Sequence, residues 1–151
     1  MEWQAIFGMA IVVLLVYFLR SRASRKRKME DKLMSSVNYS RRITPPKSTP
    51  EKGNRRSKEQ IAKDRAEHQR MLGNDFRKRA KVDQIKAERV GSTSYIWRSA
   101  GDSGCCESCA KNNGKTFQWK KPPRTGHPGE GRCCANGYCR CYAEVIIPRQ
   151  R

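Results

Sequence analysis

The chain has 151 residues, of which 33 are lysine or arginine and 14 are acidic, giving a formal net charge of +19. Only 36% of its residues are hydrophobic, and many of them lie in one N-terminal run. The rest of the chain therefore cannot bury a large core. So much positive charge repels itself in a compact globule, but it suits a polyanion such as DNA, RNA or an anionic lipid surface.

The N-terminal run Ala5–Leu19 contains no charged residue, asparagine, glutamine or proline. A helix over it is near the short limit for crossing a bilayer. Six of the nine residues from Arg20 to Lys28 are basic, an order opposite to that of a secretory signal peptide. We therefore predict a transmembrane anchor at residues 1–20, with the N-terminus outside and the C-terminus cytoplasmic. An interfacial or buried helix is the alternative.

Residues 21–56 combine many charges with three prolines and few large apolar side chains. This composition is typical of a mobile tether, because it offers little to bury. We predict a basic, disordered linker here.

Residues 57–91 predict a basic helical arm. Ser57, with Gln60 three residues later, forms the pattern of a capping box at a helix start. The pair Gly73–Asn74 indicates a stop. A second helix is then expected to end before Gly91.

Between residues 20 and 90 there are 23 basic and 9 acidic residues. This surplus predicts nonspecific, salt-sensitive binding to phosphate backbones, or to anionic lipid near a bilayer. A plain solvated helix face is the alternative for any one of these side chains. The candidate nucleic-acid or lipid-binding residues are Arg20, Arg22, Arg25, Lys26, Arg27, Lys28, Arg77, Lys78, Arg79 and Lys81.

Residues 92–151 predict a small β-rich module, which makes the chain α+β. Three short stretches rich in aromatic and β-branched residues, 93–97, 115–119 and 141–147, are separated by Gly, Asn and Pro. We expect them to be three strands of one small sheet. All seven cysteines of the chain lie in this module.

The cysteine spacing predicts a metal site. Cys106 and Cys109 form a C-x-x-C motif, which lets two thiolates reach one tetrahedral ion. His127, Cys139 and Cys141 can close the ligand shell from a separate loop. A module this small needs such a staple, and we predict that zinc binds these five residues. Disulfides and free or partly oxidised thiols stay open as alternatives, although a reducing cytoplasmic face favours thiolates.

An enzyme is not expected. Cysteine catalysis needs a thiolate, a histidine base and an orienting third group. The chain has two histidines, His68 and His127. His127 lies among cysteines with metal-ligand spacing, and His68 on a predicted helix face is expected to be structural.

Four pieces of sequence, "YIWRSAGD", "NGKTF", "PPRTGHPGE" and "CRCYAE", occur in this order after residue 94. Together with the predicted helical segment before them, these pieces make residues 60–148 resemble the C-terminal part of the phage head morphogenesis family, the phage Mu protein F-like minor head proteins. The resemblance implies a non-catalytic head component near the portal, with roles in head assembly and in handling the packaged genome. It places the family's aromatic and basic signature on Tyr95, Trp97, Arg98 and Asp102.

Two departures from the family pattern stand out. Members usually have a long N-terminal head-associated region, where this chain has the predicted anchor and linker. The segment "RCCANGY" is inserted and adds Cys133 and Cys134, so there are more thiols than one zinc requires.

The sequence as a whole predicts a membrane-anchored phage or prophage minor head or virion assembly protein. It would link a membrane to nucleic acid or to head or portal proteins. In a virion, this membrane would be an internal one. The alternative is a membrane-tethered, zinc-stabilised, nucleic-acid-binding regulator of prophage origin.

Overall fold

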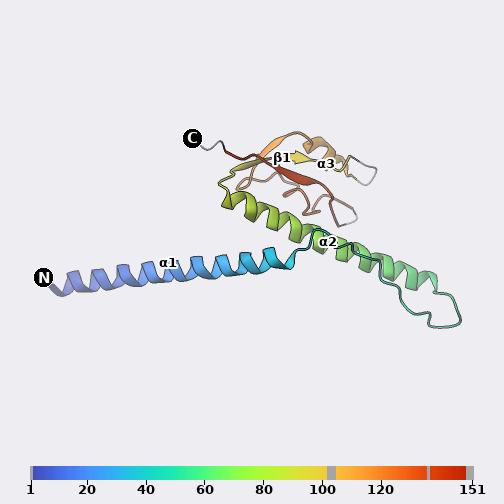
Figure 1. Cartoon of the computed structure of the whole chain (residues 1–151), viewed down its shortest axis with the longest axis horizontal. Coiled ribbons are helices and arrows are strands. Elements are labelled where there is room, and N and C mark those ends of the chain that lie inside the picture. The colour runs from blue at the N-terminus through green and yellow to red at the C-terminus, as the bar shows by residue number, and fades with distance from the viewer. Residues whose placement is uncertain (1, 102–104, 136, 149–151) are drawn as a thin grey trace. The chain divides into compact units, whose positions relative to one another are not determined.

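The computed structural model describes residues 2–101, 105–135 and 137–148. The chain divides into two compact units, Met1–Ser36 and Val37–Arg151, and each is described by itself. The elements in chain order (Figure 1) are α1 (Glu2–Ser36), α2 (Lys58–Arg89), β1 (Ser94–Arg98), α3 (Glu107–Asn112), β2 (Thr116–Gln118) and β3 (Tyr142–Val145).

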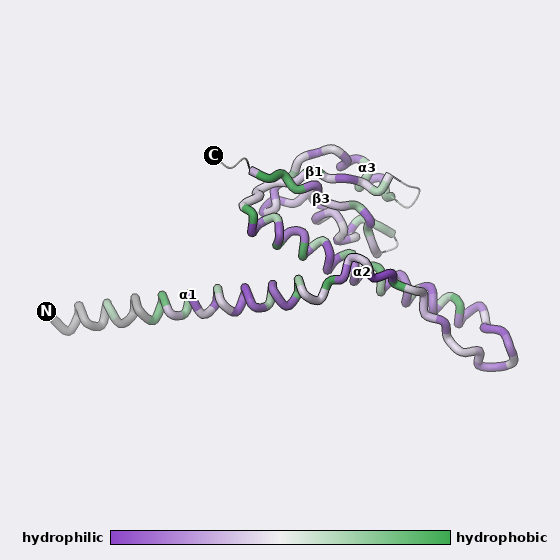
Figure 2. Tube along the Cα trace, viewed as in Figure 1, coloured by the Kyte–Doolittle hydropathy of each residue, from purple (hydrophilic) through white to green (hydrophobic). Residues whose placement is uncertain are grey.

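The first unit is the single helix α1. The helix includes the apolar run Ala5–Leu19 and continues without a break through the basic residues from Arg20 to Lys28. All six basic side chains in that stretch are exposed. Figure 2 shows the change to hydrophilic residues along the second half of this helix.

The predicted transmembrane anchor at residues 1–20 was wrong. Among the residues that the structure describes, no helix is both long enough and apolar enough to cross a membrane. The apolar run has 15 residues, about 22 Å of helix, whereas the hydrocarbon core of a bilayer is about 30 Å thick. The single-pass arrangement, with the N-terminus outside and the C-terminus cytoplasmic, was therefore also wrong.

The second unit is organised around α2, which is capped at both ends. The predicted capping box is confirmed: the Ser57 side chain accepts a hydrogen bond from the Gln60 backbone N–H, and the Gln60 side chain accepts one from the Ser57 N–H. At the other end, the N–H of Ser92 donates to the carbonyl of Ala87 at 2.9 Å. Gly91, which directly precedes Ser92, has a φ of +79°, so this is a Schellman-type ending.

The predicted stop at Gly73–Asn74 was wrong, because α2 runs through both residues. Gly73 is buried, and a Cβ atom there would lie 2.8 Å from the carbonyl oxygen of Gly137. Glycine therefore serves a close approach between the helix and a loop. It does not end the helix.

Residues 37–56, called the strap below, run along α2 in the opposite direction. The strap has no helix or strand, but hydrogen bonds hold it at intervals. These join Tyr39 to Asp83 (2.6 Å), the carbonyl of Ile43 to His68 (3.3 Å), and the N–H of Ser48 to Asp64 (3.0 Å). Arg56 also pairs with Asp64 at 2.6 Å, so an ion pair adds to the hydrogen bonds that hold the strap along α2.

The three predicted strands are confirmed. They form one antiparallel sheet in the order β2-β1-β3. Alternate residues of β1 are buried, and Tyr95 and Trp97 are 0% and 1% exposed. These two rings form the centre of the core with Trp119 and buried cysteines. Val82, Ile85 and Ala87 of α2 are also buried.

The compact units divide at a different place from the predicted segments. The sequence predicted boundaries after residues 20, 56 and 91, whereas α1 extends to Ser36 and the rest of the chain forms one unit. The strap belongs to that unit because it is hydrogen-bonded to α2, and α2 in turn contacts β3.

Candidate metal centre

Two segments bring the cysteines together. Cys106 is the N-cap residue of α3, and Cys109 lies in the first turn of that short helix. Residues three apart on a helix share a face, so both sulfurs point the same way. The second segment is the loop from Gly131 to Cys141, in which a Cβ atom on Gly131 would lie 2.9 Å from the carbonyl oxygen of Gly137. This tight loop presents its cysteines to those of α3.

A first thiol group consists of Cys106, Cys109, Cys133 and Cys134. Their Sγ atoms all lie within 4.8 Å of one another. Five of these sulfur–sulfur distances lie between 3.4 and 4.0 Å. A tetrahedral ion with sulfur ligands at about 2.3 Å places the sulfurs about 3.8 Å apart. The group therefore has the size that one thiolate-bound metal ion requires.

The sulfurs are not paired with each other. All seven cysteines are free thiols, and the separations of 3.4 Å or more far exceed the disulfide bond length of about 2.05 Å. The structure thus shows converging thiols, the arrangement that the metal interpretation needs.

A second thiol group overlaps the first. It consists of Cys109, Cys139 and Cys141, whose Sγ atoms also lie within 4.8 Å of one another. All three are buried, and the distance from the Cys109 sulfur to the Cys139 sulfur is 3.6 Å. Cys109 belongs to both groups and lies between the other five thiols.

Burial and mutual hydrogen bonding set the proton affinities of these thiols. Burial raises the pKa of Cys109, because a buried thiolate loses its hydration. Cys139 goes the other way: a hydrogen bond from the Cys141 thiol, with further donors, lowers its pKa to about 5 despite burial. The same hydrogen bond raises the pKa of Cys141. The cluster thus stabilises negative charge on one sulfur at the expense of its neighbours.

His127, the fifth predicted ligand, lies outside both thiol groups. Its Nδ1 atom is 3.0 Å from the Tyr95 hydroxyl, and its ring packs 5.5 Å from the ring of Trp119, centroid to centroid. Burial lowers the pKa of His127. The structure therefore brings four of the five predicted ligands into thiol groups and places the histidine among aromatic rings.

Cys133 and Cys134 were not among the predicted ligands, yet both belong to the first thiol group. A signal was present in the sequence, because they lie only five or six residues before Cys139 and share its loop. What the spacing could not give was the fold-back at Gly131, which turns this pair toward α3.

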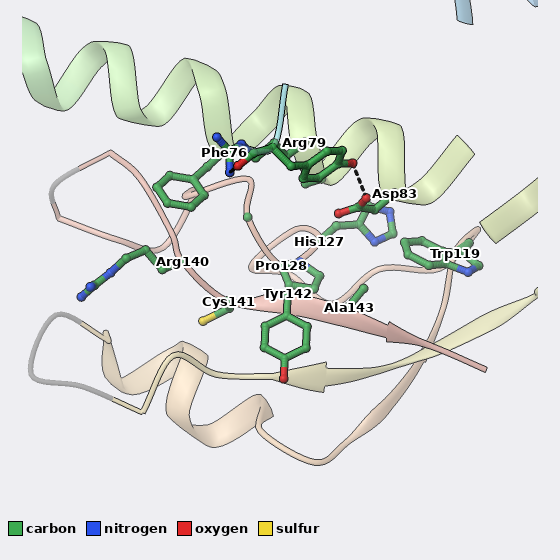
Figure 3. Close-up of a pocket in the computed structure, with 13 residues that line it drawn as sticks. Phe76, Arg79, Asp83, Trp119, His127, Pro128, Arg140, Cys141, Tyr142 and Ala143 are labelled. Atoms are coloured by element: carbon green, nitrogen blue, oxygen red, sulfur yellow. Dashed lines mark hydrogen bonds between the residues drawn. The ribbon is translucent and has the colours of Figure 1, made fainter. Parts of the chain in front are cut away.

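A cavity of about 180 Å³ lies between α2 and β3. Figure 3 shows Phe76 and Asp83 of α2 on one side, Tyr142 and Ala143 on the other, and His127 between them. Tyr39 also lines the cavity, and its hydroxyl donates a hydrogen bond to Asp83 at 2.6 Å. The cavity is below the roughly 300 Å³ of a typical small-molecule pocket, and we assign no ligand to it.

Nine of the ten predicted nucleic-acid or lipid-binding residues are exposed. The six in α1 lie on that helix, and Arg77, Lys78 and Lys81 lie on α2. Arg79 is the exception. Its guanidinium pairs with Asp75 at 2.6 Å and lies over the ring of Tyr39 at 5.6 Å, so this side chain holds the strap against α2.

The residues of the family-like signature have structural roles where the structure describes them. Tyr95 and Trp97 are core residues of β1, and Arg98 forms an ion pair with Glu144 across the strands. Asp102 lies outside the described residues.

Comparisons with known proteins show little similarity. No protein-family model matches the chain, and no solved structure matches it. An uncharacterized protein of Haemophilus influenzae is 32% identical over 69 residues. The match covers 45% of this chain and 14% of that protein. The chain thus spans a small part of this relative, whose description states no activity.

Proposed function

We propose that the first thiol group binds zinc and that this ion staples the C-terminal module of the second unit. The observation that carries the proposal is the spacing of the four sulfurs, 3.4 to 4.0 Å for five of their pairs. Soft thiolate ligands in a tetrahedral set favour zinc over magnesium, calcium or manganese.

Four protein thiolates around one ion make its role structural. A catalytic zinc keeps one coordination position open for water or substrate, whereas a Cys₄ shell fills all four. The three strands have five, three and four residues. Such a short sheet buries little apolar surface, and a metal that joins α3 to the loop before β3 supplies the missing stabilisation.

The test is the metal content of the full-length chain, purified under reducing conditions. Bound zinc is expected, and Cys106→Ser should lower both zinc affinity and melting temperature. Cys105→Ser is the matched control, because Cys105 is adjacent in sequence and belongs to neither thiol group. A metal-free chain with the same stability in both variants would refute the proposal.

For the whole chain, we propose a non-catalytic, nucleic-acid-binding protein of phage or prophage origin, acting as a minor head or virion assembly component. The sequence resemblance described above and the net charge of +19 support this. A zinc-stabilised regulator of prophage origin is the alternative. A head component should be found by mass spectrometry in purified particles, whereas a regulator should be absent from them.

Nucleic-acid binding can be tested on its own. The chain should bind duplex DNA of any sequence, with an affinity that falls steeply as salt rises. Replacing Lys78 and Lys81 with glutamate should weaken binding, since both side chains are exposed on α2. The control is the replacement of Glu107 and Glu144 with glutamine, because these side chains are also exposed but acidic. Binding that is independent of salt would contradict the proposal.

A further inference from the structure

A single zinc ion in the first thiol group leaves two buried cysteines unused. Cys139 and Cys141 are 4% and 5% exposed, and both lie close to Cys109. The three Sγ atoms lie within 4.8 Å of one another, and no disulfide joins them. The second thiol group therefore needs its own explanation.

A very small cavity lies beside the second thiol group. Its volume is about 10 Å³, and five of its eight lining residues are cysteines. A space of this size holds about one water molecule, which excludes an organic ligand and admits a bare ion. The cysteines that line it are Cys105, Cys109, Cys134, Cys139 and Cys141.

The charge balance of the cluster is compatible with a second ion. Four thiolates around one divalent ion carry a net charge of about −2. Ionising two more buried thiols without a counter-ion would be costly, because uncompensated buried charge is strongly destabilising. A second divalent ion offsets both charges, so that six thiolates and two ions again carry −2. The strongly basic chain, at +19, favours this residual negative charge.

We propose that the six clustered cysteines bind two thiolate-preferring metal ions, in the first instance zinc, and that Cys109 bridges them. Cys106 and Cys133 are terminal ligands of one ion, and Cys139 and Cys141 of the other. Cys134 belongs to the first group and lines the small cavity, so it serves as the second bridge. This inference rests on the proposed zinc site in the first thiol group.

Metal stoichiometry tests the inference directly. The full-length chain, prepared under reducing conditions and weighed intact by native mass spectrometry, is expected to carry two zinc ions. Cys141→Ser should carry one and stay folded, because the first thiol group remains complete. Cys105 lines the small cavity but belongs to neither thiol group, so Cys105→Ser tests the ligand assignment and should keep both ions. Loss of an ion from this variant would overturn the assignment.

Cobalt(II) tests the bridge without any substitution. Two cobalt ions that share a thiolate couple magnetically, so the electron paramagnetic resonance signal per ion should fall as the second equivalent binds. Two separate sites would give a signal that simply doubles, which would overturn the bridging role of Cys109.

The outcomes separate this inference from the proposed function. Two ions bound to the unaltered chain support both. If the unaltered chain and Cys141→Ser each carry one ion, the proposed staple stands and the second site is refuted. A chain without bound metal refutes both.

Discussion

The two halves of the second unit are held together in different ways. Along α2, the strap and the helix caps make conventional hydrogen bonds and ion pairs, such as Tyr39 to Asp83 and Arg56 to Asp64. In the sheet module, seven cysteines lie beside a small aromatic core. The first half draws its stability from the backbone and from charge, whereas the second depends on sulfur chemistry. The two halves should therefore respond differently to the same perturbation.

Metal removal should have the largest effect, and the two halves should respond to it differently. Structural zinc contributes about 10–16 kcal/mol of apparent binding free energy in small zinc modules. A strong chelator is therefore expected to abolish the near-ultraviolet circular dichroism of Trp97 and Trp119, which are buried in the module. Hydrogen exchange should show that amides in the first turns of α2 keep their protection. Uniform loss of protection would show that both halves depend on the metal.

Gly73→Ala should have an intermediate effect on the junction between the halves. In an exposed helix this change is stabilising by about 1 kcal/mol. Here the new Cβ atom would meet the Gly137 carbonyl oxygen at 2.8 Å, and overpacking costs about 1–3 kcal/mol. Urea unfolding should show a net loss of stability. Asn74→Ala, on the exposed neighbouring position, is the control and should be neutral or stabilising.

Ser57→Ala should have the smallest effect and should be confined to the α2 half. The substitution removes the capping hydrogen bond to the Gln60 N–H, which is worth about 1 kcal/mol. The midpoint of urea unfolding should fall slightly, while metal content stays the same. A change in metal content would show that the two halves are more strongly coupled than the contacts indicate.

Local patterns predicted the local structure well. The capping box at Ser57 was readable because its two residues are neighbours on one helix turn. The strands were readable because aromatic and β-branched residues alternate between the two faces of β1. The C-x-x-C motif likewise indicated that Cys106 and Cys109 would converge, since Cys106 caps α3 and Cys109 lies in its first turn.

Features that depend on distant contacts could not be read in the same way. Gly73 resembles a helix stop, and only the position of Gly137, 64 residues later, explains why it lies within α2. His127 has the spacing of a metal ligand, but the hydroxyl of Tyr95 and the ring of Trp119 hold it elsewhere. The apolar run in α1 resembled a membrane span because its 15 residues fall just short of the roughly 17 that a spanning helix needs. The basic residues of the same helix follow it directly.

The unbroken course of α2 has a consequence for how its sequence can vary. Each residue advances a helix by about 100°, so Asp64 and Asp83 keep a fixed rotational phase relative to one another. A one-residue insertion between them would swing one carboxylate about a quarter-turn away from the strap. Seven inserted residues, close to two full turns, would nearly restore the phase but would move the two carboxylates about 10 Å further apart along the helix axis. The strap would then have to lengthen by the same amount, so the lengths of the helix and of the strap should vary together.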